Sequence, residues 1–335
     1  MSCLPRHLRH SFFLLLFAVM LFLTAPGPVR AQSPSSDDIY VLGVFYFTGR
    51  YVPQDYQWAA VQFRKAADAG NPRAEYMLGY LYENGLGVPK DYAAAAALYR
   101  ASAIQGYAHA EDNLASLYQR GLGVPKDIRE AVRWYLPAAV QGDAIAQSNL
   151  GSLFYAGTEI DQDFSQAAHW FRAAAESGEP HAQNQLAVMY FRGQGVPLDH
   201  RDAARWAELA AEKGNRAGQA NLGYLYERGW GVPLDYVAAF TWYSRASRSG
   251  DHVAAERLAS LREIMTPKQI NRAEDLSNAY TPSNASATLV SKEAADNPAS
   301  AVLPQAVIIS GGLSEQSSSP RPISLPSHPA PYWIW

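Results

Sequence analysis

The heptapeptide GLGVPKD occupies residues 85–91 and returns, letter for letter, at residues 121–127. Two glycines close to a lysine could belong to a phosphate-binding loop or to a structural unit that the chain uses repeatedly. A dinucleotide-binding fingerprint needs a third glycine where Lys90 stands, and a P-loop needs Ser or Thr where Asp91 stands. The sequence therefore argues against a nucleotide site.

The 36-residue distance between the two heptapeptides is kept along most of the chain without an insertion. An aspartate recurs at this interval, and a glycine follows fifteen residues after each one. The aspartates are Asp55, Asp91, Asp127, Asp163, Asp199 and Asp235, and the glycines are Gly70, Gly106, Gly142, Gly178, Gly214 and Gly250. A fixed period of this length is the signature of a repeat protein.

Each 36-residue unit predicts two helices. In the second unit the first helix covers residues 72–84 and ends at Gly85, a residue suited to a left-handed C-terminal position. Asp91 is expected to cap the second helix, which ends near Gly106. In later units, Glu130 and Gln166 three residues after the capping aspartate predict capping boxes.

The consensus of the units is A-x-x-x-L-G-x-x-Y, then G-x-G-V-P-x-D, then an aromatic pair before A-A-x-x-G. This pattern resembles the Sel1-like repeat family, a relative of the tetratricopeptide repeats, over six repeats from about residue 38 to residue 250. The resemblance implies an all-α fold, a right-handed α-α superhelical solenoid, that binds other proteins or peptides. A stack of such units leaves an extended curved surface for a partner.

The N-terminal segment predicts export. Arg6 and Arg9 precede a short apolar run at residues 12–23, and Val29-Arg30-Ala31 fits a signal-peptide cleavage site. We therefore expect residues 1–31 to be a signal peptide cleaved after Ala31, and the protein to be periplasmic or secreted, with no membrane segment after cleavage. Residues 32–37 are then a short linker.

The C-terminal part divides into a cap and a tail. After Gly250 an unpaired helix is expected over about residues 252–262, and Thr266, Pro267 and Gln269 open a further helix to about residue 278. These capping helices complete a solenoid domain at residues 38–280. Residues 281–335 contain eight prolines and eleven serines, a composition typical of disorder. An idle tail and a docking peptide, within residues 303–310 or the closing PYWIW, both remain open.

Charge and cysteine content narrow the possible partners. Loss of the signal peptide removes three arginines and leaves 25 basic and 31 acidic residues, a net charge of −6. Nucleic acid is therefore not an expected partner, because it needs an excess of Lys and Arg. The single cysteine, Cys3, lies in the expected signal peptide, so we expect neither disulfides nor thiol chemistry.

No catalytic motif and no metal-ligand spacing stand out, so we expect no enzyme, cofactor or metal site. The resemblance implies an exported scaffold or adaptor that binds a protein or peptide in a concave groove, as part of an envelope signalling or assembly complex. The alternatives are a cell-wall or glycan-binding module and a β-lactam-binding hydrolase. The latter activity is linked to cysteine-rich relatives, which this chain does not match.

The candidate binding residues lie on the second face of the first helix of each repeat, which the resemblance places on the concave side. They are Tyr76, Tyr80, Asn113, Arg120, Asn149, Gln185, Arg192, Asn221, Tyr224 and Arg228. Amides and arginines suit a peptide, because they bond its backbone and its carboxylates. The asparagines share one repeat position, so hydrogen bonding between neighbouring helices is an equally open interpretation. Trp230 is a second candidate anchor, unless it packs against the following repeat.

Two loops depart from the consensus. Tyr51 and Glu159 stand where the other repeats have the second glycine of the heptapeptide. Because only glycine has free access to positive φ, we expect both loops to follow a different path.

Overall fold

The computed structural model describes residues 33–279, which form helices and connecting loops without a β-strand. The described helices are α2 (Ser36–Thr48), α3 (Tyr56–Asp68), α4 (Pro72–Asn84), α5 (Tyr92–Ile104), α6 (Ala108–Arg120), α7 (Ile128–Val140), α8 (Ala144–Ala156), α9 (Phe164–Glu176), α10 (Pro180–Arg192), α11 (His200–Glu212), α12 (Arg216–Arg228), α13 (Tyr236–Arg248), α14 (His252–Ile264) and α15 (Pro267–Asn278). The expected signal peptide at residues 1–31 and the tail at residues 281–335 lie outside the described residues.

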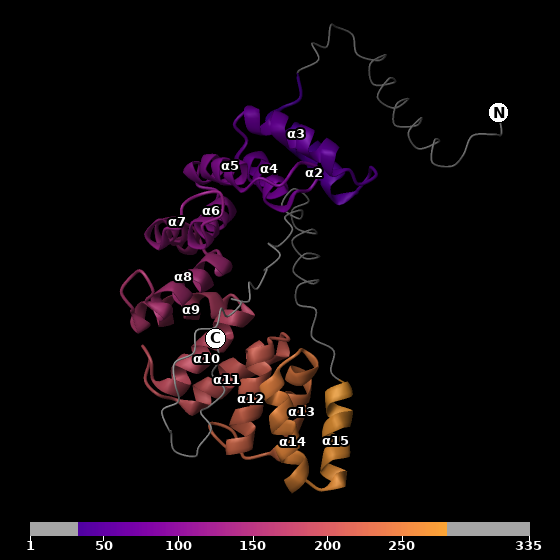
Figure 1. The fold of residues 1–335 in the computed structure, drawn as a ribbon, viewed down its shortest axis with the longest axis vertical. Helices are drawn as coiled ribbons and strands as arrows, with labels where there is room; N and C mark the ends of the chain where they lie inside the picture. The colour runs from indigo at the N-terminus through magenta and orange to yellow at the C-terminus, as the bar shows by residue number, and fades with distance from the viewer. Residues whose placement is uncertain (1–32, 280–335) are drawn as a thin grey trace, which may run out of the picture.

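The helices form a curved stack of antiparallel pairs from α2 to α13, followed by α14 and α15 (Figure 1). We call the first helix of each repeat helix A (α2, α4, α6, α8, α10 and α12) and the second helix B (α3, α5, α7, α9, α11 and α13). Helix A packs most extensively against helix B of its own repeat and next against helix B of the preceding repeat. In addition, α10 touches α8 and α12 directly, whereas no successive helices B among the described residues make a comparable contact. Helices A therefore line the inner, concave side of the curve.

The helix ends follow the sequence signals closely. The Asp91 carboxylate accepts from the backbone N–H groups of Ala93 and Ala94, at 2.9 and 3.0 Å, and the other five aspartates cap helix B in the same way. The predicted capping boxes of α7 and α9 are wrong. In α7, Glu130 instead forms an ion pair with Arg133, at 2.6 Å. Among the described helices, reciprocal capping boxes form at Ser35 and at Thr266.

The loop between helices A and B is the joint of each repeat. Gly85 ends α4 with φ 69°, and Gly87 has φ 68°. A Cβ atom at Gly87 would lie 2.2 Å from the carbonyl carbon of Tyr56, the first residue of helix B in the preceding repeat. The same clash would arise at Gly123, Gly195 and Gly231. The second glycine is therefore required for two reasons: its backbone is left-handed, and the neighbouring helix leaves no room for a side chain.

The two exceptional loops behave differently from each other. Tyr51 keeps the left-handed backbone, with φ 71°, so the prediction of a different path is wrong there. Among the described residues no helix precedes α2, and the Tyr51 side chain is 77% exposed. Glu159 departs from the other loops, with φ 124°, and its carboxylate pairs with Lys126 at 2.7 Å. The prediction is confirmed for this loop.

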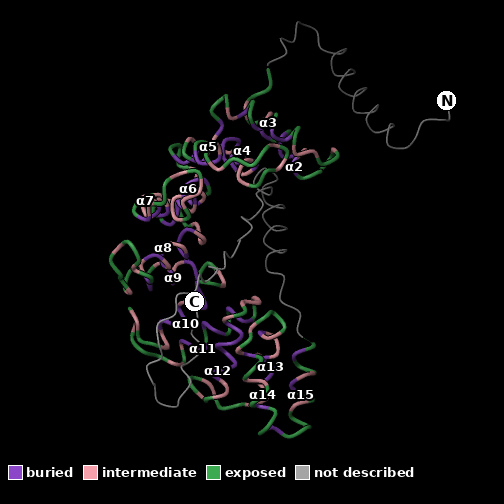
Figure 2. Tube along the Cα trace, in the orientation of Figure 1, coloured by how far each residue is buried: buried purple, intermediate pink, exposed green. Residues whose placement is uncertain are grey.

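The core runs along the stack as a continuous layer between helices A and B, visible as the buried faces in Figure 2. A small residue of helix A faces an aromatic ring of helix B, and a Cβ at Gly79 would lie 2.8 Å from the Tyr99 ring. Gly43, Gly151 and Gly223 meet Phe63, Phe171 and Tyr243 in the same way. The fifth repeat has Ala187 and Ala207 at these positions, both buried. In this repeat, alanine replaces the glycine of helix A and alanine also replaces the aromatic residue of helix B, so a larger residue on one helix is matched by a smaller one on the other.

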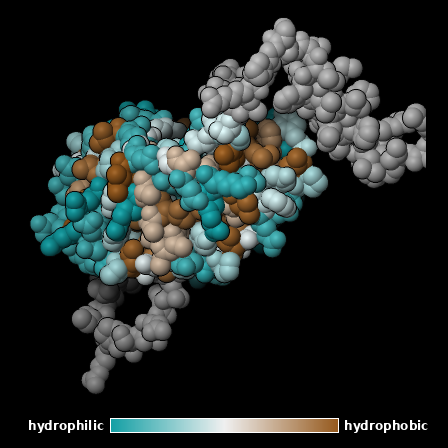
Figure 3. Space-filling model, turned by 90° about the horizontal axis from the view of Figure 1, so that it is seen from above, coloured by the Kyte–Doolittle hydropathy of each residue, from teal (hydrophilic) through white to brown (hydrophobic). Residues whose placement is uncertain are grey.

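The two ends of the array differ. At the N-terminus α2 begins at Ser36, so the last two residues of the expected linker are helical. Leu42 is partly exposed there, whereas its counterparts in later repeats are buried. Figure 3, which looks down on this end, shows apolar surface in several separate places between polar side chains. At the other end α15 packs on α13 rather than forming a regular pair with α14, and it covers the last helix B.

The joint can be tested by replacing glycines with alanine. Gly87→Ala should destabilise the fold by about 3 kcal/mol or more, because a strained φ adds to a clash with Tyr56. Gly106→Ala is the matched control, since Gly106 has φ 81° and no atom within 4 Å of an added Cβ. The control should cost about 1 kcal/mol. Urea unfolding followed by circular dichroism measures both, and equal losses would contradict the role assigned to the close approach.

Candidate functional site

The ten predicted binding residues all lie on helices A, but they differ in exposure. Tyr76, Asn221 and Tyr224 are buried. Tyr80, Asn113, Asn149 and Gln185 are half-buried, whereas Arg120, Arg192 and Arg228 are exposed. The three arginines are thus the members of the set that a partner reaches most directly.

The buried members belong to the contacts between repeats. The Tyr76 ring lies 5.8 Å from that of Tyr99 and 5.3 Å from that of Tyr107, in centroid distance. Burial raises the pKa of Tyr76 well above its usual range. Tyr76 is therefore part of the core, and its side chain does not line an open groove.

The asparagines form hydrogen bonds between successive helices A. Asn221 donates to the Asn184 amide oxygen at 2.8 Å, and Asn149 donates to the Asp112 carboxylate at 3.3 Å. These two pairs occupy the same repeat positions, 72 residues apart along the chain. The interpretation that asparagines link neighbouring helices therefore holds for both, and their role in binding stays a prediction.

The exposed arginines each lie against a residue of helix A. Arg120 is 3.6 Å from the Glu83 carboxylate, and Arg192 donates to the Tyr155 hydroxyl at 3.1 Å. Arg228 is 3.9 Å from the Glu227 carboxylate and lies over the ring of Tyr224, 5.6 Å from its centroid. These contacts orient guanidinium groups along the concave side.

Two of the half-buried members contact an aromatic ring. The Tyr80 ring packs edge-on against Phe47 at 6.1 Å, and the Gln185 amide lies 3.5 Å from the His181 ring. Asn113 lies one turn ahead of Leu117 on α6, with its side chain half-buried. Aromatic edges and amides of this kind can contact a peptide backbone without large rearrangement.

Asp112 is a polar residue of the concave side that the sequence analysis missed. It is buried, and burial, with a further contribution from the Asp143 carboxylate, raises its pKa to about 7. The Asn149 hydrogen bond and His109 act in the opposite direction. The sequence does contain a signal for Asp112, because a charged residue stands there at a repeat position that other repeats fill with Tyr76, Ser148 and Asn184.

Glu83 and Glu227 were also missed, although the repeats contain a signal for them. Their carboxylates accept from the hydroxyls of Tyr99 and Tyr243, at 2.8 and 2.7 Å, and in the third repeat Gln119 accepts from Tyr135. The first and fourth repeats have phenylalanine in helix B and an aromatic residue at the glutamate position, namely Phe47 and Tyr155. An acceptor is present only where helix B supplies a hydroxyl.

Trp230 packs on the preceding repeat, so the interpretation that it contacts the following repeat is wrong. Its ring stacks on His200 at 5.6 Å with an interplanar angle of 11°, and it lies near Phe191 and Tyr224. It remains 38% exposed, so it can also contact a partner.

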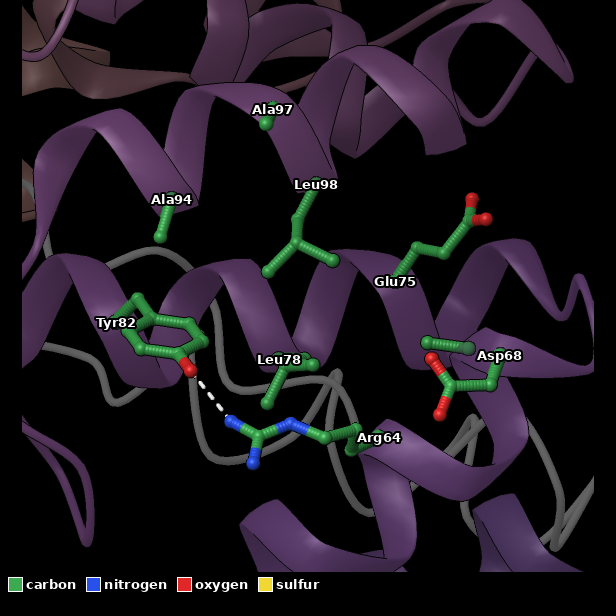
Figure 4. Close-up of a pocket in the computed structure, with 9 residues that line it drawn as sticks. Arg64, Asp68, Glu75, Leu78, Tyr82, Ala94, Ala97 and Leu98 are labelled. Atoms are coloured by element: carbon green, nitrogen blue, oxygen red, sulfur yellow. Dashed lines mark hydrogen bonds between the residues drawn. The ribbon is translucent and has the colours of Figure 1, made fainter.

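A hollow of about 460 Å³ lies where α3, α4 and α5 meet (Figure 4). Arg64 crosses it and donates to the Tyr82 hydroxyl, while Leu78 and Leu98 form its floor. The same arginine–tyrosine contact recurs at Arg100 with Tyr118 and at Arg172 with Tyr190. The contact that crosses the hollow is therefore a recurrent feature of the repeat junction and does not single out a ligand site.

The described residues contain no group of three or more His, Asp or Glu side chains placed to hold a metal ion. Within residues 33–279, no helix combines the length and the apolar character that crossing a membrane requires.

Fold and surface together define an α-solenoid of helical-pair repeats with a polar and aromatic concave face. The Sel1 repeat family matches residues 36–71, 72–107, 108–143, 144–179, 180–215 and 216–251, six consecutive units of 36 residues. The chain belongs to the Sel1 repeat family.

Two solved structures illustrate the relationship. A protective antigen of uropathogenic Escherichia coli strains, which displays an SLR fold, is 34% identical with a TM-score of 0.68. The match covers 74% of this chain but only 53% of the antigen, so the chain spans about half the length of that relative. A Sel1 repeat protein from Oxalobacter formigenes is 29% identical with a TM-score of 0.62, over 71% of this chain and 96% of the other. A search of curated proteins gives no match.

The raised pKa of Asp112 makes a testable prediction about stability. A carboxyl with a pKa near 7 when folded and near 3.8 when unfolded stabilises the fold fully below pH 3.8 and loses this contribution as the pH rises through 7. Asp112→Asn should therefore gain about 2–3 kcal/mol relative to the wild type between pH 5 and pH 8. Urea unfolding at both pH values measures the difference.

The substitution copies the Asn184–Asn221 pair, so the Asn149 hydrogen bond keeps a partner. Asn184→Asp is the reciprocal control and should introduce a loss of stability with rising pH. A constant difference between Asp112→Asn and wild type across this range would contradict the burial of a titrating carboxyl.

Proposed function

We propose that the protein is a non-enzymatic scaffold or adaptor that binds a protein or peptide along its concave face. The observation that carries this proposal is the row of exposed guanidinium groups on helices A, interleaved with half-buried amides and aromatic rings. A repeat array presents such a surface over several units, which suits an extended partner better than a small molecule. Membership of the Sel1 repeat family supports the same class of function.

The partner proposed is a polypeptide of an envelope signalling or assembly complex, met in the periplasm or outside the cell. The basic, apolar and small-residue segments at residues 1–31 support export. The relative from Escherichia coli is a protective antigen, and this description supports the proposal of a location outside the cytoplasm for this chain.

A glycan-binding module is the second candidate, favoured by the partly exposed Trp230 ring. Aromatic faces and arginines could pack against sugars of the cell wall. A β-lactam-binding hydrolase has less support, because the disulfide-stapled relatives with that activity have no counterpart in the cysteine content of this chain.

Site-directed photocrosslinking tests the proposal in the native envelope. With p-benzoylphenylalanine at Arg120 or at Arg192, both exposed on helices A, a discrete crosslinked protein adduct is expected because these positions face the proposed partner. Arg133 and Val140, exposed on helix B of the third repeat, are the matched control positions and should give no such adduct. Immunoblotting and mass spectrometry of the adduct provide the measurement.

Adducts from the helix B positions alone, or from none of the four positions, would contradict binding on the concave face. Two further assays address the other candidates. Retention on purified peptidoglycan without any protein adduct would favour the glycan-binding module, and nitrocefin turnover would favour a hydrolase.

A further inference from the structure

Aromatic and arginine side chains gather at the junction of the fifth and sixth repeats, where α10, α12 and α14 follow one another (Figure 1). The Tyr224 ring has Arg228 at 5.6 Å and Arg257 at 5.7 Å from its centroid, and Trp230 packs edge-on against it at 5.6 Å. Phe191 lies 5.5 Å from Trp230 and 6.4 Å from Tyr224, in centroid distance. We call these five residues the arginine–aromatic cluster.

Of the five junctions between the six described repeats, one has this combination of residues. At the tryptophan position, repeats two and three have Leu86 and Leu122, and repeats four and five have Thr158 and Gln194. At the Arg257 position, the four preceding repeats have Asn113, Asn149, Gln185 and Asn221. The first junction, where Phe47 packs on Tyr56 and Tyr80, has aromatic rings at equivalent positions but no arginine. Repeat architecture alone therefore does not account for the combination.

The joint of the sixth repeat holds Trp230 in place. Gly231 approaches the first residue of α11 so closely that an added Cβ would lie 1.8 Å from the His200 carbonyl oxygen. This contact places the preceding residue, Trp230, flat against the His200 ring. A partner would meet an indole that is already fixed, and pre-organisation of this kind lowers the entropic cost of binding.

Two members of the cluster offer exposed surface. Trp230 is 38% exposed and the Arg228 side chain 44%, whereas Tyr224 is buried between them. Both flank the same tyrosine ring, so their exposed parts are separated by a short distance. Alternate residues of an extended peptide, about 7 Å apart on one side, can reach both.

The charge at the cluster favours an anion. The Glu227 carboxylate accepts from the Tyr243 hydroxyl and pairs with Arg257 at 3.2 Å, while Arg228 lies 3.9 Å away from it. The single carboxylate of Glu227 thus lies near two guanidinium groups, so the three side chains together carry a net positive charge. The net charge of helices A also becomes positive towards the cluster. Helices α2, α4 and α6 carry net charges of −2, −1 and −1, α8 is neutral, and α10 and α12 each carry +1.

We propose that the arginine–aromatic cluster is the anchor point of the concave face and binds a peptide segment in which an acidic side chain alternates with an aromatic one. The carboxylate pairs with Arg228 and the aromatic ring packs on Trp230. The charge gradient along helices A orients the rest of the peptide, with its acidic part over α10 and α12. This inference rests on the proposed function and specifies the chemistry of the partner.

The test uses the full-length protein and two synthetic peptides, acetyl-Asp-Phe-Asp-Phe-amide and acetyl-Asn-Phe-Asn-Phe-amide. Isothermal titration calorimetry, which needs no reporter side chain, should show the acidic peptide binding about tenfold more tightly, because its Asp carboxylate can form an ion pair with Arg228 and the Asn amide cannot. In the wild type, the indole N–H signal of Trp230 in NMR spectra shows that binding takes place at the cluster. Trp230→Leu and Arg228→Asn should each weaken binding of the acidic peptide about tenfold. Both variants copy residues of the second repeat, Leu86 and Asn84, so the joint is preserved.

Arg133→Asn is the control, since the Arg133 side chain is 75% exposed on helix B, outside the concave face. It should leave binding of the acidic peptide unchanged. Equal affinity for the two peptides, or an equal loss in the Arg133 and Arg228 variants, would overturn the proposal. Tighter binding of a uronic-acid oligosaccharide than of the acidic peptide would overturn it as well.

The two proposals can fail separately. Photocrosslinking from Arg192 can be repeated in a variant that combines Trp230→Leu and Arg228→Asn. If a partner is captured and the yield of its adduct is the same in this variant, the cluster is not the anchor, while the scaffold function stands. If no partner is captured and the acidic peptide still binds at Trp230, the scaffold function fails while the chemistry of the cluster is supported.

Discussion

The close approach of the loop between helices A and B to the preceding repeat is the contact on which the array depends, and a glycine makes it in four of the six repeats. The second glycine of the joint lies against the first residue of the preceding helix B, and no side chain fits between them. The contact fixes the separation of successive repeats and therefore the spacing of helices A. Side chains that would otherwise be independent, such as Asn149 and Asp112 or Asn221 and Asn184, come within hydrogen-bonding distance through this spacing.

The sequence predicts most of the fold because its signals are local. The capping aspartates, the C-terminal glycines and the period of 36 residues each act within one repeat, and the helices begin and end where these residues stand. The errors have two different causes. Tyr51 keeps a left-handed backbone at a loop with no described helix before its repeat. Glu130 pairs with Arg133, three residues later on the same helix, instead of completing a capping box, and capping signals alone do not reveal this competing partner.

The candidate site was predicted less completely for the same physical reason. Helical spacing indicates which residues of helix A share a face, but the adjacent repeats decide how much of that face stays accessible. Tyr80 is half-buried and Tyr224, at the same repeat position four units later, is buried under Trp230 and two arginines. Asp112 is a further example, since it was not predicted to belong to this face, and burial raises the pKa of its carboxyl.

Departures from the consensus carry the specific information in such a chain. A residue shared by all six repeats serves the joint, the cap or the core, and a partner cannot distinguish one unit from another by it. Discrimination along the array needs residues that differ between units, and these differences concentrate on helices A and in the loops that follow them. The change from Leu86 to Trp230 and from Asn84 to Arg228 alters the surface without altering the backbone that supports it. A rigid joint thus permits variation of the exposed residues, since the fold does not depend on them.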